Sequence, residues 1–259
     1  MKMQGRPIAP GKAAGRALVY PTPFSFVGGA DPTTGRILDP RWEGDGRLAG
    51  RIFAFPHGKG STVGSYVIYG LAKRRVGPAA IVNASAEGII AVGATLAEIP
   101  LVDRVDTACL KTGDRMRVDG DRGTVELPDV KAIPVATSVL WNRGRLLIVR
   151  RSDAVGSFPG RWSAISGFVE GREEPKARAI QEIREETGMR GVRFRTAGLP
   201  MFARHRRTIY VVHPFRFDVA TREVRLDWEN VESRWIRPEE IDRFETVPRL
   251  KDVVASVVP

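Results

Sequence analysis

The chain has 259 residues, enough for two domains, and its hydrophobic share of 42% and charged share of 27% are typical of globular proteins, not of disordered ones. No stretch is long and apolar enough for a membrane span, and the N-terminal MKMQGRPIAPGKAAG lacks the apolar core of a signal peptide, so we expect a cytoplasmic protein with no membrane partner. The single cysteine, Cys109, excludes an internal disulfide and any metal cluster built from cysteines of this chain.

The net charge of +11 raises the question of a nucleic-acid partner. Because the arginines are scattered among carboxylates and the sequence carries no nucleic-acid-binding motif, we do not expect one. Attraction of phosphorylated small molecules explains the basic bias equally well.

Glycine, β-branched residues and turns dominate the first half of the chain, residues 1–129. Short apolar runs between turns predict strands at 16–20, 50–55 and 79–83, followed by a hairpin at 116–127. Residues 61–73 carry apolar side chains at helical spacing, whereas residues 23–39 are expected to be mostly loop. Strands and short helices around one curled sheet indicate a small barrel-like α/β domain.

The run 57–61, with the sequence HGKGS, lies between a predicted strand and a predicted helix. Glycines let a ligand approach the backbone, and free N–H groups at a helix start favour anions, which makes Gly58, Lys59 and Gly60 candidate substrate-binding residues. The same run also fits a tight turn before a helix that Ser61 caps, with no ligand. Taken alone, these residues favour the plainer interpretation.

A series of short motifs follows through this half in a fixed order. The motifs are Ala9–Gly11, Ser25-Phe26, Gly28-Gly29, Asp31-Pro32, Thr34-Gly35, Gly58–Ser61, Ser65, Gly77–Ile81, Val102-Asp103 and Val118–Gly120. Together they resemble the swivel domain of aconitase X, the small subunit of archaeal phosphomevalonate dehydratase, over residues 5–127. The resemblance implies a swivelling β/α barrel that docks on a separate large subunit, and that the large subunit carries an iron–sulfur cluster.

By the same resemblance, the two subunits dehydrate 5-phosphomevalonate to anhydromevalonate phosphate in the archaeal mevalonate pathway, and Ser61 is the proton acceptor. A serine hydroxyl needs activation to act as a base, which the helix start and Lys59 can provide. Two positions depart from the family. Val27 stands where an aromatic residue is usual, and residues 41–47 (RWEGDGR) replace a His-Pro-Leu segment. Both departures concern the identity of the substrate and the activity itself.

The stretch 128–134, PDVKAIP, has a proline at each end and predicts a compact linker between a first domain at 1–129 and a second at 130–259. Beyond it, apolar runs and turn signals predict strands at 135–141, 145–150, 192–196, 207–212, 215–219 and 232–236. A short closing helix is expected at 238–244.

A helix that starts at Pro175 and ends before Gly188 is the most informative prediction in the chain. Glu182, Glu185 and Glu186 fall at i, i+3 and i+4, so their carboxylates share one helix face. Three like charges at one point repel each other, and a hard divalent cation, which prefers oxygen ligands, would compensate them. The alternative is the ordinary solvated face of a Glu-rich helix.

The spacing continues on both sides of these carboxylates. Gly167, five residues, Glu173, seven residues and then 181–189 (QEIREETGM) resemble the Nudix box. The resemblance implies an α/β/α sandwich that hydrolyses a diphosphate linked to another moiety, with Mg²⁺ or Mn²⁺ as its cofactor. It also implies a set of metal ligands, namely Glu182, Glu185, Glu186 and the carbonyl of Gly167. Two of these, Glu185 and Glu186, would be catalytic.

Gln181 replaces an arginine of the family, which pairs with the residue at Glu173 and holds the loop against the helix. An amide still accepts and donates a hydrogen bond, but the charge-assisted pairing is lost, so we expect weakened activity and not its abolition. Glu229 and Glu232 are either an extra metal ligand or base, or ordinary surface carboxylates. Residues 204–207 (RHRR) either bind substrate phosphates or protect an edge strand by their charge.

The sequence thus predicts a two-domain α/β protein, with a swivelling β/α barrel-like domain followed by an α/β/α Nudix sandwich. Two functions remain open for the whole chain. One is a bifunctional enzyme, a lyase small subunit joined to a hydrolase of a nucleotide-like or isoprenoid diphosphate. The other is a docking or regulatory protein, whose Nudix half binds a diphosphate ligand without turnover.

Overall fold

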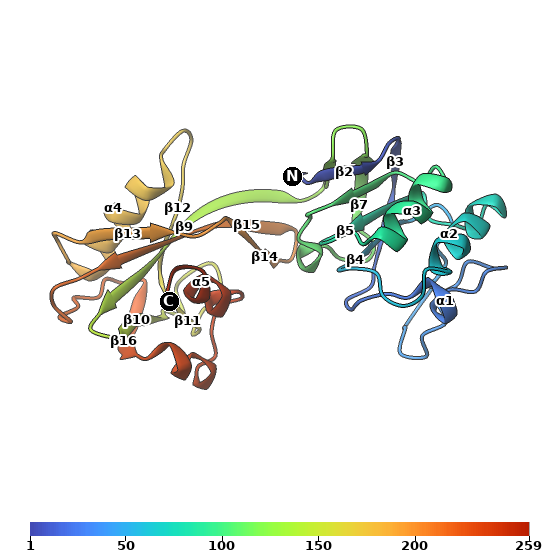
Figure 1. The fold of residues 1–259 in the computed structure, drawn as a ribbon. Helices are drawn as coiled ribbons and strands as arrows, with labels where there is room; N and C mark the ends of the chain where they lie inside the picture. Colours follow the sequence, from blue (N-terminus) through green and yellow to red (C-terminus); the bar gives the residue numbers. More distant parts are fainter. Residues whose placement is uncertain (259) are drawn as a thin grey trace. The chain divides into compact units, whose positions relative to one another are not determined.

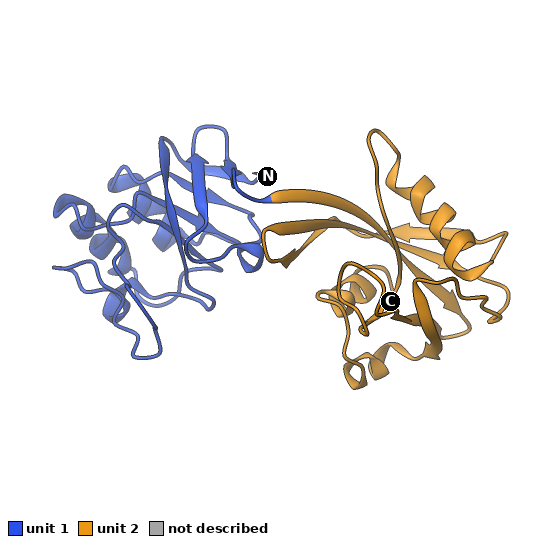
Figure 2. Ribbon diagram, turned by 180° about the vertical axis from the view of Figure 1, so that it is seen from behind, with its two compact units in different colours: residues 1–130 blue, residues 131–259 orange. Residues whose placement is uncertain are grey.

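The computed structural model describes residues 1–258. The chain divides into two compact units, residues 1–130 and 131–259 (Figure 2). Each unit is a β-sheet with helices packed on it, so the two-domain α/β fold predicted from the sequence is confirmed (Figure 1). None of the helices in the described part of the chain is long and apolar enough to cross a membrane.

Eight strands form the sheet of the first unit. They are β1 (Lys2–Gln4), β2 (Arg6–Ala9), β3 (Lys12–Val19), β4 (Ile52–Phe55), β5 (Ala80–Asn83), β6 (Leu101–Asp103), β7 (Arg115–Asp119) and β8 (Thr124–Glu126). Their order in the sheet is β1-β8-β7-β3-β4-β5-β6-β2. Only Gly5 separates β1 from β2 in the chain, yet these strands lie at opposite ends of the order, so the sheet curls round on itself as a barrel.

The strands β3 to β6 run parallel, and helices connect them. These helices are α1 (Phe26–Gly29), α2 (Gly64–Lys73) and α3 (Gly88–Leu96), and the 3₁₀ turn η1 (Thr107–Cys109) follows β6. Phe24 packs edge to face on both Phe26 and Phe53 in the core of this unit. This cluster fixes the loop before α1 to β4, and it therefore fixes the position of the turn that follows β4.

Eight strands also form the sheet of the second unit. They are β9 (Lys131–Asn142), β10 (Arg145–Arg151), β11 (Trp162–Ser163), β12 (Ile165–Phe168), β13 (Arg193–Ala197), β14 (Met201–His205), β15 (Thr208–Asp218) and β16 (Asn230–Ile236). The main path is β11-β10-β9-β15-β13, with β12 paired to β9, β14 to β15 and β16 to β10. The long strand β9 is parallel to β15 and antiparallel to β10 and β12.

This sheet carries a helix on each face. Leu146 and Ile148 of β10 belong to one apolar cluster with α5 (Leu250–Val257) and η2 (Pro238–Arg243), while Leu147 belongs to another with α4 (Pro175–Thr187). Alternate residues of a strand point to opposite faces of the sheet, which explains the division. The arrangement is helix, sheet, helix, as expected for this half.

Two segments differ from their sequence-based expectation. Residues 131–134, expected to belong to a linker, are the start of β9 and pair with residues 208–211 of β15. Pro134 is accommodated in the strand, and its carbonyl accepts a hydrogen bond from the Val169 N–H at 3.0 Å. The closing helix expected at 238–244 is the 3₁₀ turn η2, and the longer helix α5 follows it.

Candidate functional sites

The helix α4 begins and ends where its local sequence dictates. Pro175 occupies its first turn, and the Glu174 carboxylate caps it by accepting a hydrogen bond from the Ala177 N–H at 3.0 Å. Gly188 ends it in the left-handed conformation, with φ of 69°. The buried side chain of Ile183 faces the sheet, so the residues beside it on the helix also face inward.

Two of the three carboxylates predicted to share one face lie buried under α4, and the third lies outside. Glu182 and Glu186 are 6% and 3% exposed, whereas Glu185 is exposed. Gln181, at the position of the family's arginine, donates a hydrogen bond from Nε2 to Glu185 Oε1 at 2.8 Å. The amide therefore holds Glu185 along the outer side of the helix.

Other predicted residues lie apart from the buried pair. Glu173 accepts a hydrogen bond from the Glu170 N–H at 3.4 Å, and no hydrogen bond joins it to Gln181 within residues 1–258. Glu232 accepts a hydrogen bond from Arg150 Nε at 3.0 Å and pairs with a second arginine of β16. Glu232 is therefore part of a surface ion-pair network and not of the site.

Glu186 is a buried acid held by neutral donors. Its Oε2 accepts a hydrogen bond from Asn230 Nδ2 at 2.6 Å, and its Oε1 accepts one from the Ser166 N–H at 3.2 Å. Burial raises the pKa of Glu186 to about 8 against these two bonds, and the nearby carboxylates of Glu182 and Glu229 raise it further. Asn230 Oδ1 is also buried and has no hydrogen-bond partner in the described residues.

Glu182 lies against the backbone of β12 and carries a cationic partner. Burial raises the pKa of Glu182, and the ion pair with Arg178 one turn earlier on α4 opposes that shift. A Cβ atom at Gly167 would overlap the Glu182 carboxylate, so only glycine allows this close approach. Gly167 therefore lies against Glu182, while the predicted role of its carbonyl as a metal ligand stays a prediction.

The acidic face fits a hard cation in its chemistry but is not arranged around one. Among residues 1–258, no three His, Cys, Asp or Glu side chains converge closely enough to hold a metal ion as they stand. Arg178 holds Glu182, and Gln181 holds Glu185. Two buried carboxylates and the unpartnered Asn230 Oδ1 are nevertheless oxygen donors short of positive charge, which is what Mg²⁺ or Mn²⁺ compensates.

A cavity of about 170 Å³, open to solvent, adjoins Glu182 of the buried pair. Gly167, Arg178, Glu182 and Glu229 line one part of it, and the rings of Phe158, Phe168 and Tyr210 line another. The Phe168 and Tyr210 rings are within 20° of parallel, with centroids 6.3 Å apart. Ser163 also lies on the cavity wall; it is 3% exposed, and its Oγ has no hydrogen-bond partner in the described residues.

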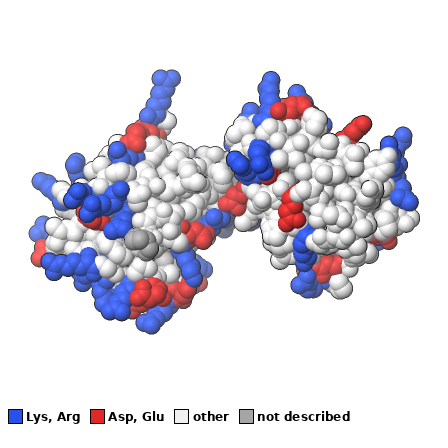
Figure 3. Space-filling view, viewed as in Figure 1, with Lys and Arg blue, Asp and Glu red and all other residues white. Residues whose placement is uncertain are grey.

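Glu229 thus lies on the cavity wall, which is compatible with its interpretation as an extra metal ligand or base. The basic run 204–207 spans the tight turn between β14 and β15, and the His205 ring lies 4.8 Å from that of Phe158, centroid to centroid. On the face shown in Figure 3, acidic side chains lie scattered among the basic ones in both units.

In the first unit, the glycine-rich turn lies between β4 and α2. A Cβ at Gly58 would lie 2.6 Å from the Ile90 side chain, and Gly60 has φ of 100°, so both positions require glycine. The exposed Ser61 accepts a hydrogen bond from the Val63 N–H at 3.3 Å. Ser61 is not the helix cap, because α2 begins at Gly64, three residues further on.

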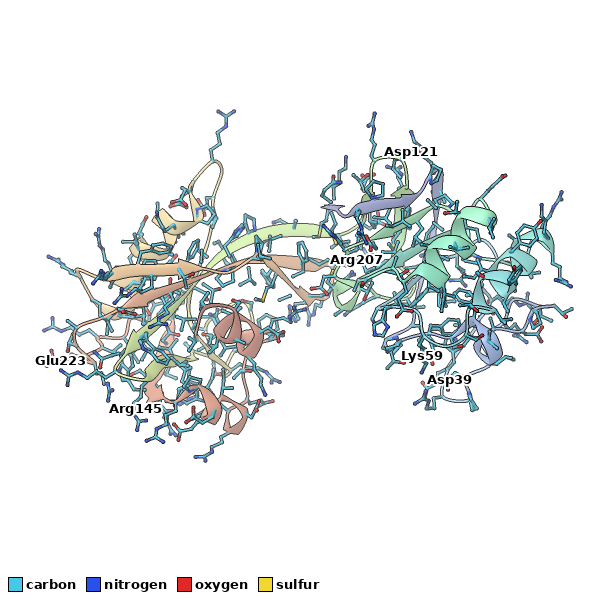
Figure 4. The ribbon with its side chains drawn as sticks, viewed as in Figure 1. Asp39, Lys59, Asp121, Arg145, Arg207 and Glu223 are labelled. Atoms are coloured by element: carbon cyan, nitrogen blue, oxygen red, sulfur yellow. The ribbon has the colours of Figure 1, made fainter. Side chains whose placement is uncertain are left out.

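Sequence reasoning missed Asp39, which lies on the same side of this unit as Lys59 (Figure 4). Lys59, Asp39 and Tyr20 line one cavity. Arg41, within the segment that departs from the family, donates hydrogen bonds to both Asp39 oxygens, at 3.0 and 2.9 Å. These bonds, together with one from the Tyr20 hydroxyl, hold the pKa of Asp39 well below its usual range. No motif or spacing in the sequence predicts the contact between Arg41 and Asp39.

The raised pKa of Glu186 predicts a pH dependence of stability in the absence of divalent cations. The folded protein keeps a proton that the unfolded chain releases above the ordinary pKa of 4.5. This contribution is fully present below pH 4.5 and is lost as the pH rises through about 8. We expect urea unfolding in EDTA to show wild-type stability falling over this range relative to Glu186→Gln. A difference that stays constant with pH would contradict the buried, protonated carboxyl.

Comparison with known proteins assigns each half to a family. Residues 2–127 match the family described as aconitase X swivel domain, and residues 132–257 match the NUDIX domain. The phosphomevalonate dehydratase small subunit of Pyrococcus furiosus is 55% identical over 128 residues, which are 49% of this chain and 96% of that protein.

Two solved structures are also similar. Thermococcus kodakaraensis aconitase X in its holo-form is 51% identical over 49% of this chain and 98% of its own, with a TM-score of 0.47. A MutT protein from Methanosarcina mazei is 24% identical over 49% of this chain and 93% of its own, with a TM-score of 0.44. By the family matches and the identity to the curated small subunit, the chain belongs in its first half to the aconitase X swivel family of phosphomevalonate dehydratase small subunits, and its second half is a NUDIX domain.

Proposed function

We propose that residues 131–257 hydrolyse a diphosphate with Mg²⁺ or Mn²⁺ at the buried carboxylates of α4. The observation that carries this proposal is the pair Glu182 and Glu186, buried beside an open cavity with one guanidinium, that of Arg178, for two carboxylates. Nudix domains generally use these ions. The carbonyl of Gly167 and Asn230 Oδ1 add further oxygen donors of the kind that hard cations prefer.

The groups of the chain divide the work of this reaction between them. When bound, the cation polarises a phosphate oxygen and offsets the charge of the leaving phosphate. Glu182, Glu185 and Glu186 would hold it, and for Glu185 this would replace its hydrogen bond with Gln181. Glu229 at the cavity accepts the proton of the attacking water, while the bond from phosphorus to the bridging oxygen breaks.

The cavity favours a nucleotide-like head group over an isoprenoid chain. Phe168 and Tyr210 offer flat, nearly parallel rings, on which a base stacks with a gain of about 1–3 kcal/mol.

The test is a substrate panel. Full-length protein with Mg²⁺ is offered nucleoside and isoprenoid diphosphates, and the release of phosphate or monophosphate is measured. We expect release from the nucleotides and its loss in Glu185→Gln and in Glu186→Gln, because each variant removes a carboxylate that would hold the cation. Glu232→Gln, on the surface network with Arg150, is the matched control and should retain activity.

One observation favours a second function for this half. Arg178 and Gln181 hold two of the carboxylates, so the site as it stands is suited to binding a diphosphate ligand without turnover, as a docking or regulatory protein does. Tight diphosphate binding with no product release in the same panel would support this alternative and contradict the hydrolase.

For residues 2–127 we propose the role that the curated relatives carry in their name, that of a phosphomevalonate dehydratase small subunit. Its partner is a separate large subunit that holds the iron–sulfur cluster, and Ser61 accepts a proton of 5-phosphomevalonate. Support comes from the exposed Ser61 hydroxyl, whose oxygen accepts the Val63 N–H, and from Lys59 on the neighbouring cavity. The hydrogen bond from the Val63 N–H favours negative charge on that oxygen.

This proposal predicts the behaviour of Ser61→Ala in a complex with a large subunit. Dehydration of 5-phosphomevalonate should fall about 10²–10⁴-fold, the usual contribution of a proton-transferring group. Thr95→Ala removes an exposed hydroxyl of α3 and should leave the rate unchanged. Full dehydration by the Ser61→Ala complex would remove the serine from its role.

A further inference from the structure

Arg178 supplies the positive charge next to Glu182 that a bound cation would otherwise supply. It is one turn before Glu182 on α4, and its guanidinium forms an ion pair with that carboxylate. The side chains of Glu182 and Arg178 are 8% and 25% exposed, so water screens their attraction less than at a free surface. In the described part of the chain, Glu182 is the one acidic partner of Arg178, and the buried Nε of Arg178 makes no hydrogen bond.

The same carboxylate belongs to the oxygen donors that a divalent cation would use. A guanidinium and a divalent cation on one buried carboxylate repel each other, so the two compete for Glu182. This competition accounts for the finding that the acidic residues do not converge as a ligand set: one carboxylate already has its positive charge.

A released Arg178 would remain in the cavity. Its side chain lines the cavity together with Gly167 and Glu229, on the side where the diphosphate is proposed to bind. A guanidinium offers five donors in a planar fork, which matches the oxygens of a phosphate. Arg178 can therefore exchange its first partner, Glu182, for the phosphates of a ligand in the same cavity.

We propose that Arg178 is an internal competitor of the divalent cation. It neutralises Glu182 in the metal-free protein and transfers to the phosphates of the ligand when the cation takes Glu182. Cation and diphosphate then bind cooperatively, because each removes the obstacle to the other, and this coupling is reciprocal. The inference rests on the proposed metal site, but it concerns binding and does not require turnover.

The experiment measures Mn²⁺ binding to full-length protein by electron paramagnetic resonance of the free ion, with and without imidodiphosphate. In this diphosphate analogue a nitrogen replaces the bridging oxygen, so the phosphorus–oxygen bond that hydrolysis would break is absent. Without imidodiphosphate, Arg178→Ala should bind Mn²⁺ about tenfold more tightly than wild type, or more, because a buried carboxylate is left uncompensated. The gain in Mn²⁺ affinity that imidodiphosphate produces should be smaller in Arg178→Ala than in wild type. Arg184→Ala, an exposed arginine on the same helix, should behave as wild type.

Arg178→Met keeps the length of the side chain without its charge and guards against a folding defect of the alanine variant; it should also bind Mn²⁺ more tightly. Unchanged or weaker Mn²⁺ binding in both variants overturns the inference, and so does the absence of Mn²⁺ binding in every protein. If wild type hydrolyses the diphosphate but neither variant binds Mn²⁺ more tightly, only the proposed role of Arg178 is contradicted. A gain in the variants without turnover keeps that role and removes the hydrolase.

Discussion

Burial of two acidic side chains between a helix and a sheet is the constraint on which the second unit depends. Removing a carboxylate from water is costly unless hydrogen bonds or a counter-charge replace the lost hydration. The fold meets this cost separately for each residue. Glu186 takes the Asn230 amide and a backbone N–H of β12 and holds its proton up to an unusually high pH, whereas Glu182 takes Arg178. The need for glycine at 167 follows from the same burial.

The first unit differs from the second because its candidate site is exposed to solvent. Its candidate base, Ser61, is exposed, so the structure has to position a turn instead of shielding a charge. The loop before α1 does this, since Phe24 bridges to Gly58 and packs in the aromatic core. Asp39 lines a cavity together with Lys59, and Arg41 and the Tyr20 hydroxyl keep it ionised. The chain thus carries one site made of buried charge and one made of exposed backbone.

Local signals in the sequence predicted the elements well, because they act over a few residues. Proline at 175, glycine at 188 and the apolar spacing between them were enough to predict α4, but only Glu182 and Glu186 of the three expected carboxylates lie together on its buried face. They could not predict the partner of each carboxylate, since the choice between a cation, Arg178 and Gln181 depends on side-chain packing. The ring pair Phe168 and Tyr210 was out of reach for another reason: the two residues are distant in sequence and meet only through the sheet.

The linker expectation failed in an instructive way. Two prolines argued against regular structure at 128–134, but the parallel pairing of β9 with β15 outweighs this local preference. A long strand whose parallel neighbour comes much later in the chain also sets an order of events on the ribosome. β9 is synthesised well before residues 208–218 exist to pair with it, so its edge stays open while the first unit already has all of its strands. The nascent chain therefore passes through a stage in which β9 follows a finished barrel and can pair with β10 and β12, but its edge toward β15 is still open, and an open strand edge favours aggregation.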